Sequence, residues 1–214
     1  MTDNKPSRWD SPGRSVGEAL VLVDVQQGFD DPWWGRRNNR SADANISALA
    51  AAFARAGRPL VYVRHDSDNP DSPLHPDSPG NQLKSYLPPA PDLLVTKRVN
   101  SSFHGDPDLH AWLRQHGISS FVLAGITTNH CCETTTRVGG NLGYTIRFAL
   151  DATHTFDRLG PDGRRLSADA LARATATNLH GEFATVVRTA QILAELAGAG
   201  PELAGPGGEP PRVP

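Results

Sequence analysis

The sequence predicts an α/β protein with a mostly parallel sheet and helices on both of its faces, and two observations carry that prediction. Short, uninterrupted apolar runs such as 19–25 and 121–124 are typical of parallel strands that are buried on both faces. Segments with apolar residues at helical spacing, such as 41–56, lie between these runs. With 214 residues, the chain suits a single domain with a sizeable core.

The expected elements alternate along the chain. Strands are expected at 19–25, 59–65, 92–97, 121–124, 144–150 and 183–187. Helices are expected at 41–56, 106–116, 131–142, 167–179 and 189–196. In the helix at 106–116, Asp106 is the expected N-cap and Pro107 the first helical residue. We predict one domain over residues 18–196, a flexible arm over 1–17 and a disordered Gly/Pro-rich tail over 197–214.

Composition and charge exclude several classes of protein. A formal net charge of −2 and a sequence pI near 6.4 argue against binding to nucleic acid or to a membrane surface. The two cysteines are adjacent, so they cannot join distant parts of the chain, which fits a reducing setting. The segment 1–17 lacks the apolar core of a signal peptide, and no apolar run reaches the length of a membrane span. We therefore expect a soluble, cytoplasmic protein.

Three reactive residues follow predicted strands at their carboxyl ends: Asp24, Lys97 and Cys131. In an open α/β sheet, ligands bind at that edge. Each residue also has an ordinary interpretation. Asp24 could cap a turn, Lys97 could lie in solvent at the rim, and Cys131 could pack in the core. An unpaired aspartate within an apolar strand is costly, however, so a shared site is the economical interpretation. Because Cys131 would lie in the first turn of a helix, we predict a thiol of lowered pKa there.

Three stretches resemble the signatures of the isochorismatase-like cysteine hydrolases: 22–26, 96–105 and 125–132. That family includes nicotinamidases, N-carbamoylsarcosine amidohydrolase and related amidases. The resemblance implies a Rossmann-like, three-layer αβα fold with a six-stranded sheet, and assembly as a homodimer or homotetramer. It also implies a catalytic triad of Asp24, Lys97 and Cys131.

The chemistry implied by the resemblance is a thioester mechanism. Lys97 would stabilise the Cys131 thiolate, while Asp24 takes the thiol proton and returns it to the leaving amine. Backbone N–H groups of Thr127 and Cys131 would hold the oxyanion. In the family the peptide bond before the residue matching Thr127 is typically cis, which would aim that N–H group into the oxyanion hole.

The chain departs from the family pattern in two places. A second cysteine, Cys132, stands where the family usually has an aliphatic residue, and the spacing from Gly125 and Thr128 selects Cys131 as the nucleophile. The Asp-x-His metal motif of nicotinamidases is absent after the second strand, so we expect no metal and no cofactor. The alternative is a metal bound in another geometry by residues of that region: His65, Asp66 and His75.

We predict a metal-independent hydrolase acting on an amide, lactam or carbamoyl C–N bond of a small molecule. The residues expected to contact the substrate are Gln26, Phe29, Trp34, Asn100, Phe103 and Phe156. For each of them, ordinary packing or a role in a turn is an equal alternative. Within enzymes, the rival interpretation pairs the cysteine with one of the eight histidines, of which His130 is the nearest in sequence. A metal-dependent nicotinamidase and an inactive scaffold are further alternatives. A dinucleotide-binding module lacks support because no Gly-x-Gly-x-x-Gly follows the first strand.

Overall fold

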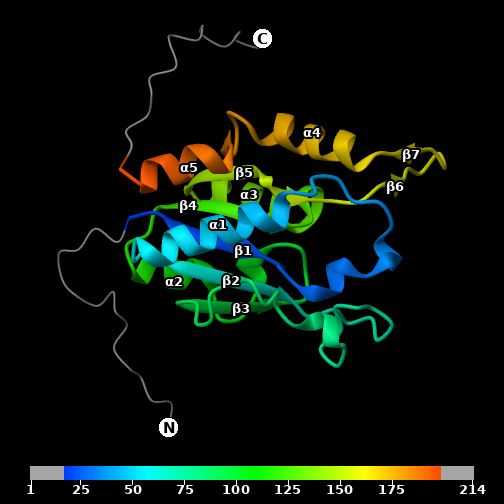
Figure 1. Cartoon of the computed structure of the whole chain (residues 1–214), viewed down its shortest axis with the longest axis horizontal. Coiled ribbons are helices and arrows are strands. Elements are labelled where there is room, and N and C mark those ends of the chain that lie inside the picture. Colours follow the sequence, from blue (N-terminus) through cyan, green and yellow to red (C-terminus); the bar gives the residue numbers. More distant parts are fainter. Residues whose placement is uncertain (1–16, 199–214) are drawn as a thin grey trace, which may run out of the picture.

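The computed structural model describes residues 17–198 of the chain, and strands and helices alternate through them (Figure 1). The strands of the main sheet are β1 (Ala19–Val23), β2 (Leu60–His65), β3 (Leu93–Lys97), β4 (Ser120–Ile126), β5 (Thr145–His154) and β8 (Thr185–Val187). The α-helices are α1 (Ala42–Arg55), α2 (Leu109–Gln115), α3 (Glu133–Asn141), α4 (Ala168–Leu179) and α5 (Thr189–Leu196). The expected arm and tail lie almost wholly outside the described residues.

The six strands form one sheet in the order β3-β2-β1-β4-β5-β8, and all of its neighbouring pairs are parallel. This confirms the predicted α/β class and the six-stranded sheet. β1 lies between β2 and β4, with Val23 opposite both Val63 and Gly125. The strand order therefore reverses direction at β1, and the carboxyl ends of β1 and β4 flank the crevice in which such folds bind ligands.

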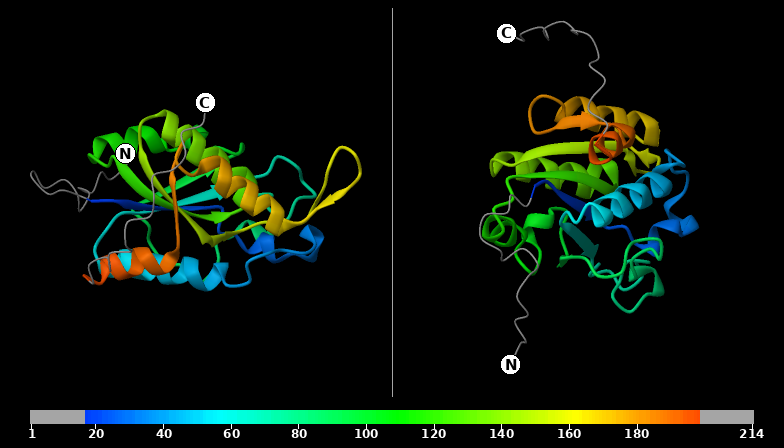
Figure 2. Two further views of the ribbon diagram at one scale, coloured as in Figure 1. Left: turned by 90° about the horizontal axis from the view of Figure 1, so that it is seen from above. Right: turned by 60° about the vertical axis from the view of Figure 1, so that its left-hand side comes forward.

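Two helical layers cover the sheet because side chains alternate between its faces along each strand. Leu20 and Leu22 point to the layer of α1 and α5, where they join a cluster that includes Phe53. Val21 points to the opposite face, where the cluster includes Leu113 of α2. Figure 2 shows the sheet between these helical layers. The result is the expected three-layer αβα arrangement.

The helix that was expected to begin at Asp106 begins instead at Leu109, after a cis peptide bond between Asp106 and Pro107. Asp106 exchanges two backbone hydrogen bonds with Thr96, of 2.8 and 2.9 Å, and so extends the edge of β3. It cannot cap a helix in that position. Asp108 is the N-cap, and its side chain accepts a backbone N–H group of the first helical turn.

Two further segments differ from expectation. The helix after β4 opens with a π-helical turn, η5 (Thr128–Cys132), before α3 begins. β5 continues to His154 because the β4–β5 ladder resumes past an irregularity, pairing Ile126 with His154. An unexpected two-stranded hairpin, β6 (Arg158–Leu159) and β7 (Arg165–Leu166), then projects from the body (Figure 2).

In residues 17–198, none of the helices has both the length and the apolar composition required to cross a lipid bilayer.

Candidate active site

Asp24, Lys97 and Cys131 meet at the carboxyl edge of the sheet. Asp24 follows β1, Lys97 ends β3, and Cys131 lies in η5 after β4. The Lys97 ammonium donates to Asp24 Oδ2 at 2.7 Å and to Cys131 Sγ at 3.4 Å. Both side chains of the Asp24–Lys97 ion pair are wholly buried. The structure thus brings together the three residues that the sequence singled out.

The backbone at the ends of β1 and β4 is specialised for this contact. Asp24 has a φ of +52°, the left-handed region that non-glycine residues rarely occupy, and its N–H group donates to Val63. Gly125 has a φ of +134°, and a Cβ atom there would lie 2.0 Å from the carbonyl oxygen of Val23. Only glycine allows β4 to pass β1 at that point. The close approach carries the turn that follows toward Asp24.

Burial and neighbouring charges shift the pKa of Lys97 in opposite directions. Burial alone would lower the pKa of its ammonium, but the neighbouring Asp24 carboxylate and the Cys131 sulfur together raise it above the usual value. Lys97 is therefore charged at neutral pH. The second carboxylate oxygen, Asp24 Oδ1, is buried and has no hydrogen-bond partner among the described residues.

The thiol of Cys131 is not the low-pKa group that its sequence position suggested. Burial raises its pKa, the Asp24 carboxylate raises it further, and Lys97 offsets only part of this. Cys131 also lies in the π-helical turn ahead of α3 rather than within the first turn of an α-helix. Full burial likewise raises the pKa of Cys132, whose side chain packs in the core. At neutral pH the Cys131 side chain is therefore a thiol rather than a thiolate.

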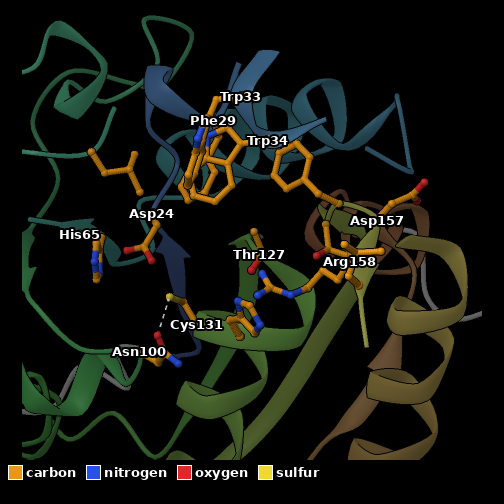
Figure 3. Close-up of a pocket in the computed structure, with 15 residues that line it drawn as sticks. Asp24, Phe29, Trp33, Trp34, His65, Asn100, Thr127, Cys131, Asp157 and Arg158 are labelled. Atoms are coloured by element: carbon orange, nitrogen blue, oxygen red, sulfur yellow. Dashed lines mark hydrogen bonds between the residues drawn. The ribbon is translucent and has the colours of Figure 1, made fainter. Parts of the chain in front are cut away.

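A cavity of about 460 Å³ opens over Cys131. One wall consists of three stacked aromatic rings: Trp34 and Phe156 have ring centroids 5.4 Å apart at 22°, and Phe29 lies 4.9 Å from Trp34. Figure 3 shows Phe29 and Trp34 of this wall on one side of the cavity, across from Cys131. Asn100 lines the cavity from another side, with its Oδ1 atom 3.8 Å from Cys131 Sγ. Four of the six expected substrate contacts therefore face the cavity.

A sequence model of the isochorismatase domain matches residues 18–191. The chain belongs to the isochorismatase family. It is 38% identical to the isochorismatase-family protein YrdC of Bacillus subtilis, over 82% of this chain and 94% of that one. It is 28% identical to ureidoacrylate amidohydrolase RutB of Pseudomonas syringae, over 73% of this chain and 78% of RutB. An isochorismatase-family crystal structure from Chromobacterium violaceum superposes with a TM-score of 0.81 at 39% identity, covering 86% of this chain and 95% of that one.

The two remaining expected contacts, Gln26 and Phe103, do not line this cavity, which corrects the sequence-based assignment. Gln26 is fully buried and clamps the loop after β2: its Nε2 donates to the carbonyl oxygens of His65 and Asn81, each at 2.9 Å. Its Oε1 accepts the His65 N–H group at 2.9 Å. Phe103 stacks on Tyr144, with ring centroids 5.7 Å apart, and packs against the core. Gln26 therefore holds the backbone of the cavity-lining His65, whereas Phe103 is a packing residue.

Arg158 of the hairpin is a cavity-lining residue that the sequence did not reveal. It extends into the cavity from the side opposite to Asp24 and His65 (Figure 3). The adjacent Asp157 is engaged at 2.9 Å by Arg36, and Arg158 has no ion-pair partner in the described part of the chain. The cavity therefore contains an uncommitted positive charge near its mouth.

The rival base His130 also lines the cavity. Burial lowers the pKa of its imidazole, and Arg158 lowers it further, so the ring is neutral at neutral pH. The hydrogen-bonding neighbours of Cys131 Sγ are Lys97 and Asn100. A Cys–His pair with His130 therefore lacks the contact that it requires.

The residues of the alternative metal site, His65, Asp66 and His75, do not come together around one position. Asp66 is paired with Arg64 at 2.9 Å, and His75 accepts the backbone N–H group of Asp77 in its own loop. Of that set, only His65 lines the cavity over Cys131.

A different group of ligand atoms does converge. The atoms offered by Asp24, His65 and Cys131 lie within 4.8 Å of one another. The ammonium of Lys97 stands among them, at 2.7, 3.3 and 3.4 Å respectively. Because this buried positive charge already occupies the position that a cation would take, these residues do not fit a resident metal ion.

Proposed function

We propose that the protein is a cysteine-dependent hydrolase that cleaves a C–N bond in a small-molecule amide, lactam or carbamoyl compound. One observation carries the proposal: a buried Asp24–Lys97 ion pair contacts a thiol, Cys131, that faces a cavity of substrate size. The family includes amide hydrolases, as the name of the RutB relative states. The proposal extends that general activity to this chain and assigns the residues.

In the first step, Asp24 Oδ1 takes the thiol proton while Sγ of Cys131 bonds to the carbonyl carbon. The Lys97 ammonium compensates the negative charge that develops on sulfur. The C=O electron pair moves to oxygen, and the N–H groups of Thr127 and Cys131 hold this oxyanion. Thr127 lines the cavity, and the peptide bond before it is cis, as the family resemblance implied.

In the second step the carbonyl re-forms and the C–N bond breaks. The protonated Asp24 gives its proton to the leaving nitrogen and a thioester remains on Cys131. From an open-chain substrate ammonia or an amine departs, whereas in a lactam the freed amine stays attached to the acyl group. Water then attacks the thioester carbon while Asp24 takes a proton from it. The thiolate leaves and recovers that proton, and the carboxylic acid is released.

The cavity favours a substrate that combines an apolar, planar body with an anionic group. The stacked rings of Phe29, Trp34 and Phe156 offer an apolar wall. Arg158 offers a guanidinium that has no ion-pair partner among residues 17–198, which suits a carboxylate. The RutB relative acts, by its name, on an acrylate, which is such an anion.

A panel of primary amides, lactams and carbamoyl compounds, assayed for release of ammonia or amine, tests this function. Each anionic compound should be paired with its neutral methyl ester. We expect turnover of at least one anionic amide by the wild-type chain and by Cys132→Ala, and none by Cys131→Ala. Turnover that survives in Cys131→Ala would overturn the proposal.

A further inference from the structure

The Lys97 ammonium has three N–H groups and three acceptors, and only two of those acceptors have a role in the mechanism above. Asp24 Oδ2 lies at 2.7 Å and Cys131 Sγ at 3.4 Å. The third acceptor is Nδ1 of His65, at 3.3 Å. His65 and Lys97 are opposite each other in the β2–β3 ladder, so this contact is built into the sheet register.

The position of His65 is fixed by its surroundings. The Gln26 side chain forms two hydrogen bonds with the His65 backbone. It accepts one from the N–H group and donates one to the carbonyl oxygen, each at 2.9 Å. Asn81 donates to the same carbonyl oxygen at 3.2 Å. The ring is half-buried, lines the cavity and stands beside Asp24 (Figure 3). Two buried amide side chains thus serve to hold one imidazole next to Lys97.

The charge state of His65 suits an acceptor. Burial lowers the pKa of its imidazole and the Lys97 ammonium lowers it further, against the opposing effect of Asp24, Asp66 and Asp68. The ring is neutral at neutral pH. Because an ammonium group only donates, Nδ1 must carry the lone pair and Nε2 the hydrogen.

We propose that His65 is a positioning residue, whose Nδ1 accepts from Lys97 and so holds the ammonium between Asp24 and Cys131. The inference rests on the proposed function, since positioning matters only if Lys97 serves the thiol. Without the third acceptor, one N–H group would lose its partner in a buried site, and the ammonium could turn away from sulfur. The effect would fall on the chemical step rather than on substrate binding.

Two substitutions separate this role from packing. His65→Leu retains bulk without an acceptor, whereas His65→Asn retains an acceptor oxygen close to the position of Nδ1. We expect His65→Leu to lower kcat by about 10- to 100-fold with little change in KM, and to move the alkylation of Cys131 by iodoacetamide to higher pH. His65→Asn should recover most of both properties. His75→Leu, in a loop outside the cavity, is the matched control and should behave as wild type.

Equal impairment of His65→Leu and His65→Asn would overturn the proposal in favour of a packing role, as would wild-type kcat and alkylation in His65→Leu. If either variant fails to fold, the protonation of His65 in the wild-type chain still tests the proposal. Nitrogen-15 NMR of the imidazole should show hydrogen on Nε2 and none on Nδ1 at neutral pH, and hydrogen on Nδ1 would contradict the proposal. The alkylation and NMR measurements need no substrate, so a failed amide screen would leave them decisive.

Discussion

The inner end of the cavity and its outer rim differ in burial and in how the fold holds them. At the inner end, the side chains of Asp24 and Lys97 are completely buried and are fixed by strands of the central sheet. At the rim, Trp33 and Leu159 are each 69% exposed, and Arg158 has no ion-pair partner within residues 17–198. The rim comes from the 3-10 turn η2 (Pro32–Trp34) and from the projecting hairpin.

If the proposed function is right, this difference separates the reaction from the choice of substrate. Moving the side chain of Asp24 or Lys97 would require a change in a sheet register that the whole core enforces. A rim residue can change without disturbing that core, because it stands on a loop or on a two-residue strand. We therefore expect substitutions at the inner end to affect kcat and substitutions at the rim to affect KM.

The largest effect is expected at Cys131. Cys131→Ala removes the proposed nucleophile and should lower kcat by about 10⁴-fold or more. Cys132→Ala, the adjacent matched control, should retain activity because its side chain is buried in the core and does not line the cavity. Peptide mapping after brief alkylation should find the label on Cys131. An active Cys131→Ala beside an inactive Cys132→Ala would reverse the assignment.

Lys97→Met should have the next largest effect. The variant keeps much of the side-chain volume but removes the charge that lowers the pKa of Cys131. That pKa should therefore rise further, shifting the alkylation profile to higher pH, and kcat should fall by about 10²- to 10³-fold. A variant with wild-type kcat and alkylation would show that Lys97 is not part of the catalytic machinery.

At the rim, Arg158→Ala should raise KM for an anionic amide by about 10-fold or more, since a hydrogen bond to a charged group contributes about 1.5–3 kcal/mol. It should leave kcat and the kinetics of the neutral ester nearly unchanged. Arg165→Ala, an exposed arginine of the same hairpin that faces Asp157, is the matched control. If Arg158→Ala instead lowers kcat for both compounds alike, the rim participates in catalysis and the division proposed here fails.

The smallest effect is expected from metal removal. Because the Lys97 ammonium stands among the ligand atoms of Asp24, His65 and Cys131, dialysis against a chelator should leave kcat within experimental error. Activity that disappears on chelation and returns with Zn²⁺, Fe²⁺ or Mn²⁺ would reopen the metal-dependent alternative.

The two regions also differ in how far the sequence could predict them. Asp24, Lys97 and Cys131 each lie at the carboxyl end of a predicted strand. Because parallel strands end at the same edge of a sheet, these residues come together independently of the loop conformations. Arg158 gave no signal, because a hairpin of two-residue strands has no periodicity to recognise. Its place in the cavity depends on how far β5 extends, which pairing with the end of β4 decides.

Errors at the inner end have a different origin. Gln26 and Phe103 lie in the motif stretches, but linear spacing does not tell which way a side chain turns, and both turn into the scaffold. The sequence does not reveal the raised pKa of Cys131, because it shows only the turn in which this cysteine lies. The burial and the Asp24 carboxylate that raise the pKa come from distant strands.

The central claim is that Cys131 becomes acylated during turnover, and trapping of the acyl-enzyme tests it most directly. The wild-type chain should be mixed with an amide that it turns over, quenched in acid within the first turnover, and digested for mass spectrometry. We predict an adduct of the mass of the acyl group on the peptide that contains Cys131, absent from Cys131→Ala and present in Cys132→Ala. Single-turnover hydrolysis with no acyl adduct on Cys131 at any quench time, or with the adduct on Cys132, would contradict the account.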